Sequence, residues 1–149
     1  MECGNRPKLS VDEIAEGVFY RGFTSDDIDE DGRIKTETLR FPDISCNSGL
    51  FSEPQDVRLR ANGRETDGCF AFSIDEVRFE AIANAVHDPV CNSERDPDNY
   101  SHCELRRLKD GETFADEPAK HNRLKSKEKK LAWRSNMGRR LTIVLQAEG

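Results

Sequence analysis

Apolar positions along this 149-residue chain recur in short, separated clusters, and several of these clusters alternate with polar residues in the two-residue period of a strand. Residues 17–23 alternate and are rich in aromatic side chains, and residues 69–72 form a continuous apolar run, so both predict strands. Residues 100–108 and 140–147 predict two more strands. Residues 41–47 predict an edge strand, because a proline occupies the second position of the segment.

Capping signals predict helices between these strands. Ser52-Glu53-Pro54-Gln55 has the form of a capping box and predicts a helix to about Ala61. Ser73-Ile74-Asp75-Glu76 is a second such box and predicts a helix of one or two turns. A longer helix is predicted over residues 117–136, with Asp116 as its cap and Gly138 as its C-terminal stop.

The remaining segments complete the predicted fold. Residues 33–39 predict a short polar strand, residues 81–87 fit either a strand or a helix, and residues 88–99 predict a loop. Strands interrupted by single helices favour an α+β fold, with a mixed, mainly antiparallel sheet and two substantial helices, the second basic and near the C-terminus. We expect a single domain over 1–149, with a loose segment over 1–16 and a basic helix plus closing strand over 117–149.

Charge is distributed unevenly along the chain, whose net charge is −6. Residues 1–119 carry 27 acidic and 14 basic side chains, whereas residues 120–149 carry two acidic and nine basic ones. This asymmetry predicts either that the basic segment rests on the acidic body or that it binds an external polyanion. Helical spacing spreads the cations of residues 120–140 around the axis, which favours a solvated helix that rests on the acidic body over a nucleic-acid reader. We expect a protein partner, and nucleic-acid contact through residues 120–140 stays open. The predicted partner-binding residues are Lys125, Lys127, Lys129, Lys130, Trp133 and Arg134.

The apolar runs and the cysteines indicate in which cellular compartment the protein is expected. The longest apolar run, near residues 141–145, is far shorter than the roughly 20 residues that cross a bilayer, so we expect no membrane span. The first residues lack the apolar stretch of a secretory signal. The five cysteines are therefore predicted to be reduced, and the protein to be cytoplasmic.

Two groups of residues carry metal-binding side chains. Asp27-x-Asp29-x-Asp31-Gly32 matches the first half of a calcium loop, but Thr38 stands where the bidentate glutamate belongs. We interpret this segment as an exposed acidic turn and leave calcium binding open. A second set has the atoms that zinc prefers without a recognised spacing, so we predict no metal there. Its members are His87, Cys91, His102 and Cys103.

Three residues far apart in the sequence could bind and cleave a dinucleotide. Arg21 lies in Tyr20-Arg21-Gly22, Ser45 in Ser45-Cys46-Asn47, and Glu104 in His102-Cys103-Glu104. A dinucleotide needs a fixed cation for its phosphates and a hydroxyl for its ribose, and cleavage of a glycosidic bond needs a carboxylate beside the developing cation.

This order resembles the Arg/Ser/Glu class of ADP-ribosyltransferases. The resemblance implies that Arg21 holds the phosphates, Ser45 holds the nicotinamide ribose and Glu104 stabilises the cationic sugar. Two motifs depart from the family pattern, since Ser45-Cys46-Asn47 replaces Ser-Thr-Ser and His102 replaces the acceptor-activating carboxylate or amide. That second departure leaves NAD hydrolysis, rather than transfer, as an implied activity. The competing structural interpretation is that Arg21 pairs with an acid on a neighbouring strand, Ser45 lies in a turn and Glu104 is exposed.

The sequence therefore supports two functional hypotheses. The first is a small intracellular interaction module without a cofactor, which binds a protein partner or a polyanion through its charge-asymmetric surface. The second is an NAD-consuming, ADP-ribosyltransferase-like enzyme that uses Arg21, Ser45 and Glu104.

Overall fold

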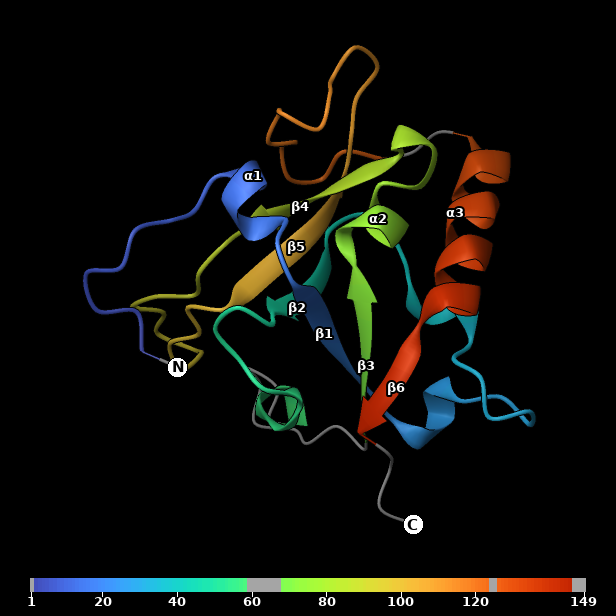
Figure 1. Cartoon of the computed structure of the whole chain (residues 1–149), viewed down its shortest axis with the longest axis horizontal. Helices are drawn as coiled ribbons and strands as arrows, with labels where there is room; N and C mark the ends of the chain where they lie inside the picture. The colour runs from blue at the N-terminus through green and yellow to red at the C-terminus, as the bar shows by residue number, and fades with distance from the viewer. Residues whose placement is uncertain (1, 59–67, 124–125, 146–149) are drawn as a thin grey trace.

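A single six-stranded sheet organises the molecule (Figure 1). The computed structural model describes residues 2–58, 68–123 and 126–145. The strand order is β4-β5-β2-β1-β3-β6, and every neighbouring pair is antiparallel. The predicted α+β class is therefore confirmed. The strands are β1 (Val18–Phe23), β2 (Ile44–Ser48), β3 (Gly68–Ser73), β4 (Ala83–His87), β5 (His102–Arg107) and β6 (Thr142–Leu145).

Helices are few in the described residues, and one of them is long. α3 spans Lys127–Arg140 near the C-terminus, whereas α1 (Val11–Ile14) and α2 (Ile74–Val77) are single turns. α1 begins at a capping box between Ser10 and Glu13, and α2 begins at the predicted box between Ser73 and Glu76. Short 3₁₀ helices complete the described elements: η1 (Ser25–Asp27), η2 (Thr36–Thr38), η3 (Pro54–Arg58) and η4 (Phe79–Ala81).

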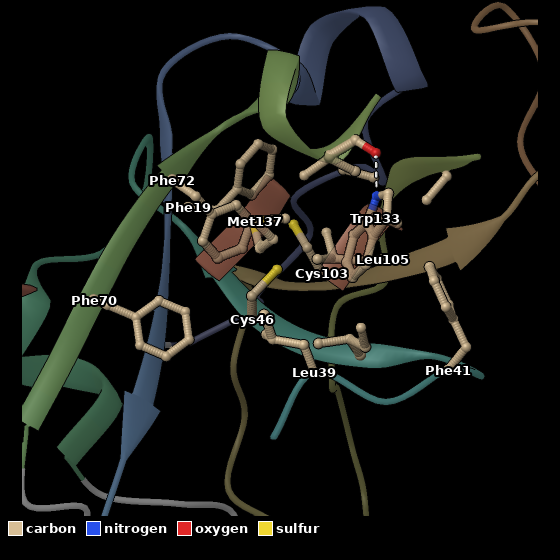
Figure 2. Close-up of a cluster of buried hydrophobic side chains, with 14 of the residues drawn as sticks. Phe19, Leu39, Phe41, Cys46, Phe70, Phe72, Cys103, Leu105, Trp133 and Met137 are labelled. Atoms are coloured by element: carbon tan, nitrogen blue, oxygen red, sulfur yellow. Dashed lines mark hydrogen bonds between the residues drawn. The ribbon is translucent and has the colours of Figure 1, made fainter. Parts of the chain in front are cut away.

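The hydrophobic core lies between one face of the sheet and the α-helices. Phe19 of β1 and Phe72 of β3 project onto this face and stack, with ring centroids 5.7 Å apart. Trp133 and Met137 of α3 pack into the same cluster and have no exposed surface (Figure 2). The Trp133 indole Nε1 donates a hydrogen bond of 2.9 Å to the Val77 carbonyl, which joins α3 to α2. Because alternate strand residues face opposite sides, the second face of the sheet remains for other side chains.

The long helix begins ten residues later than the sequence predicted. Ser126, not Asp116, caps it, since the Ser126 hydroxyl accepts the Lys129 N–H. The segment before it runs over the sheet as a loop, because its polar groups are used in tertiary hydrogen bonds. Arg106 Nη1 donates to the Pro118 carbonyl at 3.1 Å, and Asn122 Nδ2 donates to the Arg107 carbonyl at 3.1 Å. Gly138 lies inside α3 rather than after it.

Several shorter segments also differ from prediction. Residues 33–39 do not form a strand, and only Ile34 forms an isolated bridge, to Ile28. β2 is an interior strand rather than an edge strand, because the proline at position 42 precedes it and leaves its N–H groups available for pairing. Residues 81–87 contain strand β4. Of the helix predicted over residues 52–61, η3 is described and the remainder lies outside the described residues.

The N-terminal segment is attached to the body rather than loose. Cys3 and Cys91 form a disulfide, which corrects the prediction that all five cysteines are reduced. The Tyr100 hydroxyl donates to the Pro7 carbonyl at 2.6 Å, and the Leu9 N–H donates to His87 Nδ1 at 2.9 Å. These contacts hold residues 3–9 against β4 and the loop that joins β4 to β5.

Candidate active-site cleft

An open cleft of about 1130 Å³ lies over the polar face of the sheet, opposite the helices. Its floor comes from β1, β2 and β5. Its walls come from η3, from the loop between β4 and β5, and from Lys120. Arg21, Ser45 and Glu104 all line this cleft, so the fold brings together the three residues that the sequence singled out.

Arg21 lies where β1 and β2 stop pairing. The described ladder between these strands joins only Phe19 to Ser48 and Tyr20 to Asn47. One residue further along β1, Arg21 Nη1 donates a hydrogen bond of 2.5 Å to the Ser45 carbonyl of β2. Arg21 follows Phe19 by two positions and pairs with Phe70, so its side chain leaves β1 on the core-facing side of the sheet. The half-buried guanidinium reaches between the diverging strands to the Ser45 carbonyl, at the edge of the cleft.

Ser45 and Glu104 are direct partners in the β2–β5 ladder. Paired residues project from the same face of a sheet, so both side chains point into the cleft. Ser45 is the exposed residue of β2, whereas Glu104 is only 8% exposed. The competing interpretation, with Ser45 in a turn and Glu104 exposed, is therefore wrong on both points.

Glu104 is held by a network of charged side chains, of which Arg106 is buried. Its Oε1 accepts hydrogen bonds from Arg106 Nε at 2.9 Å and Nη2 at 2.8 Å, and Lys120 Nζ lies 3.8 Å away. Lys120 Nζ also lies 3.2 Å from Asp88 Oδ2. Within the described residues, Glu104 Oε2 has no hydrogen bond or ion pair, and it is not one of the buried unsatisfied atoms. One oxygen thus orients the carboxylate, and the other remains available to a ligand.

Three members of this network were not predicted as site residues. Arg106 could have been found, because His102, Glu104 and Arg106 alternate along a predicted strand and so share one face. Asp88 and Lys120 lie in segments without periodicity, and only the tertiary fold brings them to Glu104. No local sequence signal identifies them.

The outer wall of the cleft is tied to the N-terminal segment. The Asn99 side-chain amide donates to Asn47 Oδ1 at 2.9 Å, which joins the β4–β5 loop to β2. Asp98 accepts the backbone N–H of Asn92 at 3.0 Å and that of Cys3 at 3.4 Å. Together with the disulfide at Cys91, these bonds fix the position of the wall.

Charges around the cleft are divided between two ends. Carboxylates of the β4–β5 loop, from Asp96 and Asp98, lie at the outer wall. At the other end, Arg21 and its neighbour Gly22 also line a second hollow of about 520 Å³. That hollow contains Lys35 and Arg40 as well as acidic residues of η1. The second hollow is thus lined by both signs of charge, the cations Arg21, Lys35 and Arg40 and the carboxylates Asp26, Asp27 and Glu37.

Cysteine nucleophiles are absent from the described part of the cleft. Burial raises the pKa of Cys46 and of Cys69 to about 12, and it raises the pKa of Cys103 well above its usual range. These thiols therefore stay protonated near neutral pH. Cys91 is committed to its disulfide.

The four residues with zinc-binding side chains do not come together. His102 faces the cleft, whereas His87 and Cys103 are paired residues that face the core, and Cys91 is oxidised. Among residues 2–58, 68–123 and 126–145, no group of three histidine, cysteine or acidic side chains could hold a metal ion.

The acidic turn uses its carboxylates to hold its own backbone. Asp29 Oδ1 accepts the N–H groups of Asp31 and Arg33, each at 2.9 Å. Asp27 Oδ2 accepts the Thr24 N–H at 2.9 Å. These bonds are typical of Asx turns and caps and account for the spacing of the aspartates.

The predicted partner-binding segment divides between core and surface. Trp133 is entirely buried against α2, so it cannot contact a partner, which corrects that prediction. Lys127 and Lys129 are exposed, and Lys130 and Arg134 are half-buried. Arg134 Nε donates to the Leu39 carbonyl at 2.8 Å, and burial lowers the pKa of its guanidinium. Lys125 lies outside the described residues.

His87 ties the N-terminal segment to the loop between β4 and β5 and is the clearest source of pH dependence. Its Nε2 lies 2.6 Å from the Tyr100 carbonyl, which can only accept, so Nε2 carries the proton and Nδ1 accepts the Leu9 N–H. Burial lowers the pKa of His87, and it outweighs the Tyr100 carbonyl, which acts in the opposite direction. Lys8 and His102 also lower the pKa, and Asp88 raises it.

We expect the free energy of unfolding to fall as the pH falls below about 6.5, because the unfolded histidine then binds a proton that folded His87 does not. The contribution of neutral His87 to stability is complete above pH 6.5 and is lost as the pH falls toward the lower pKa of the folded state. Over this range the free energy of unfolding should change by at most about 1.4 kcal/mol per pH unit. Urea unfolding between pH 5 and 7.5 measures the slope. His87→Gln should flatten the curve in this range, and equal slopes for the variant and the wild type would contradict this assignment.

Comparison of the chain with protein-family models, with curated proteins and with solved structures gave no match. In the part of the chain that is described, no helix combines the length and apolar character needed to traverse a bilayer.

Proposed function

We propose that this protein cleaves the N-glycosidic bond between nicotinamide and ribose in NAD, as an enzyme similar to the Arg/Ser/Glu ADP-ribosyltransferases. One observation carries the proposal: Arg21, Ser45 and Glu104, predicted from three separate segments, line one cleft, with Ser45 and Glu104 paired across neighbouring strands. Ligand sites are usually concave and contain a few convergent polar groups, as this cleft does.

The proposed roles follow from the environment of each side chain. Glu104 faces the developing ribosyl cation with Oε2, while Arg106 fixes the carboxylate through Oε1. Ser45, on the exposed side of β2, orients the ribose through its hydroxyl. Arg21 binds the phosphates at the edge of the cleft, because its guanidinium is held by the Ser45 carbonyl and is always charged.

Charge at the two ends of the cleft is consistent with the two ends of NAD. The nicotinamide ring carries a positive charge and would lie near Glu104 and the carboxylates of the outer wall. The diphosphate is anionic and would lie at Arg21, which lines both the cleft and the second hollow. The dinucleotide would therefore lie with its nicotinamide near Glu104 and its phosphates at Arg21.

A cytoplasmic location stays a prediction. The disulfide between Cys3 and Cys91 weighs against it, because such bonds persist mainly in oxidising compartments.

The first test measures nicotinamide release from NAD by the purified wild-type protein. Glu104→Gln should lower the rate at least about 100-fold, because the amide no longer offers a negative charge to the cationic transition state. Gln keeps an oxygen acceptor for Arg106, so thermal unfolding should still show a folded protein. Glu117→Gln is the matched control, since Glu117 pairs with Lys8 outside the cleft. Absence of nicotinamide release at high protein concentration would refute the proposal, as would a fully active Glu104→Gln protein.

The second candidate function is the interaction module. It is favoured by the outward basic residues of α3, where Lys127 and Lys129 are exposed, and by Leu131, which is 51% exposed on the same helix. Within the described residues, no α3 side chain forms an ion pair with the acidic body, so these cations remain available to a partner. Reversal of Lys127, Lys129 and Lys130 to glutamate should leave NAD cleavage unchanged if the enzyme proposal is right. An interaction module would instead lose its partner with that variant and tolerate Glu104→Gln.

A further inference from the structure

We propose that His102 is the base that takes the proton from the water molecule attacking the ribosyl cation, so that the reaction in this cleft is hydrolysis. This inference rests on the proposed NAD cleavage and adds the acceptor and the residue that activates it. It depends on the position of the His102 ring, on its tautomer and on its limited exposure.

His102 lies beside Glu104 on the floor of the cleft. The two residues are separated by one position on β5, so both side chains project from the same face, with their Cα atoms roughly 7 Å apart along the strand. His102 pairs with Asn47 in the ladder in which Glu104 pairs with Ser45. A ribose oriented by Ser45 and Glu104 would therefore have His102 as its neighbour along β5.

The hydrogen bonds of His102 determine which nitrogen can act as a base. Nδ1 lies 2.7 Å from the Asp88 carbonyl oxygen, which can only accept, so Nδ1 carries the proton in the neutral ring. The Asp88 carboxylate is also close, with Oδ2 3.9 Å from Nδ1, and the same oxygen lies 3.8 Å from Arg106 Nη2 and 3.2 Å from Lys120 Nζ. Nε2 is then the unprotonated nitrogen.

Nε2 is available to a small molecule. Among the described residues it has no hydrogen-bond partner, and it is not one of the buried atoms that lack one, so it keeps contact with solvent. The His102 side chain is nevertheless only 17% exposed. A recessed nitrogen of this kind is more accessible to water than to the side chain of a protein acceptor.

Hydrolysis of NAD in this cleft would proceed as follows at the level of bonds and protons. The C–N bond breaks and its electron pair leaves with nicotinamide, which departs as a neutral base. Water then forms the new C–O bond to the anomeric carbon, and its proton passes to Nε2 of His102. The resulting imidazolium faces the Asp88 carboxylate, and it returns the proton to solvent after ADP-ribose leaves.

A comparison of two reactions isolates the role of His102. Hydrolysis requires removal of a proton from water, whereas the return of labelled nicotinamide to the cation does not, because its ring nitrogen carries no proton. The experiment incubates the full-length protein with NAD and isotopically labelled nicotinamide, and it measures both ADP-ribose and labelled NAD. His102→Asn is the test variant, since the asparagine amide can keep a donor toward the Asp88 carbonyl. His121→Asn is the control, because His121 is 81% exposed and contacts Asp43.

We expect His102→Asn to lower ADP-ribose formation by about 100-fold or more, the usual contribution of a general base, and to retain nicotinamide exchange within about threefold. The control should match the wild type in both reactions. Unchanged hydrolysis in His102→Asn, or loss of hydrolysis and exchange together, would overturn the assignment of His102 while leaving wild-type cleavage established. If the wild type gives neither product, the proposed function itself fails, and the inference fails with it.

Discussion

Replacement of Trp133 by alanine is expected to lower the free energy of unfolding by about 3–5 kcal/mol, the range observed when a buried aromatic residue is truncated. Trp133 has no exposed surface, and its ring centroid lies 4.7 Å from that of Phe41. The variant also leaves the Val77 carbonyl without the indole donor. Because α3 contacts the body through Trp133 and Met137, the helix should detach or lose order in the variant.

Leu131→Ala is the matched control for this prediction. Leu131 lies on the same helix two residues before Trp133 and is 51% exposed, so its truncation should change the free energy of unfolding by less than about 0.5 kcal/mol. Urea unfolding followed by circular dichroism measures both variants. Equal losses for the two variants, or a loss below about 1 kcal/mol for Trp133→Ala, would show that α3 does not depend on this contact.

Reduction of the Cys3–Cys91 disulfide is expected to lower the free energy of unfolding by about 2–4 kcal/mol. The bond closes a loop between residues 88 positions apart, which restricts the unfolded chain. In the folded state it holds the N-terminal segment against the loop that forms the outer wall of the cleft. Urea unfolding with and without a thiol reductant measures the difference.

A Cys3→Ser, Cys91→Ser double variant separates this bond from the other thiols. Cys46, Cys69 and Cys103 are buried and reduced, so the reductant should not change the stability of the double variant. The double variant should match the reduced wild type. A wild type that is insensitive to reductant, with both Cys3 and Cys91 reactive toward a thiol reagent, would show that the disulfide does not form in the protein.

Local patterns in the sequence predicted the elements whose hydrogen bonds and apolar periods are local. Residues 17–23 and 69–72 became β1 and β3, because aromatic side chains fill one face of β1 and consecutive apolar residues of β3 are buried on both faces. The box at Ser73 became the cap of α2, since a capping box involves residues only three positions apart. The sequence also indicated an α+β fold, and it singled out Arg21, Ser45 and Glu104.

Other features were decided by contacts between distant segments. The loop before α3 replaces the predicted first part of the helix, because Arg106 and Asn122 use backbone and side-chain groups in long-range hydrogen bonds. Trp133 appeared in a basic segment and was predicted to bind a partner. The fold buries it, because a helix with one apolar stripe is stabilised by placing that stripe in the core.

The cleft shows the same division. By itself, the sequence singled out Arg21, Ser45 and Glu104 as candidate residues for a dinucleotide site and placed them on strands. Only the tertiary structure decided that β5 pairs with β2, which places Glu104 opposite Ser45, and that Asp88, Arg106 and Lys120 surround the carboxylate. The physical reason is that alternation within one strand predicts which of its faces is buried. It does not specify which other strands pair with it, because strand order depends on how all strands together bury one shared apolar face.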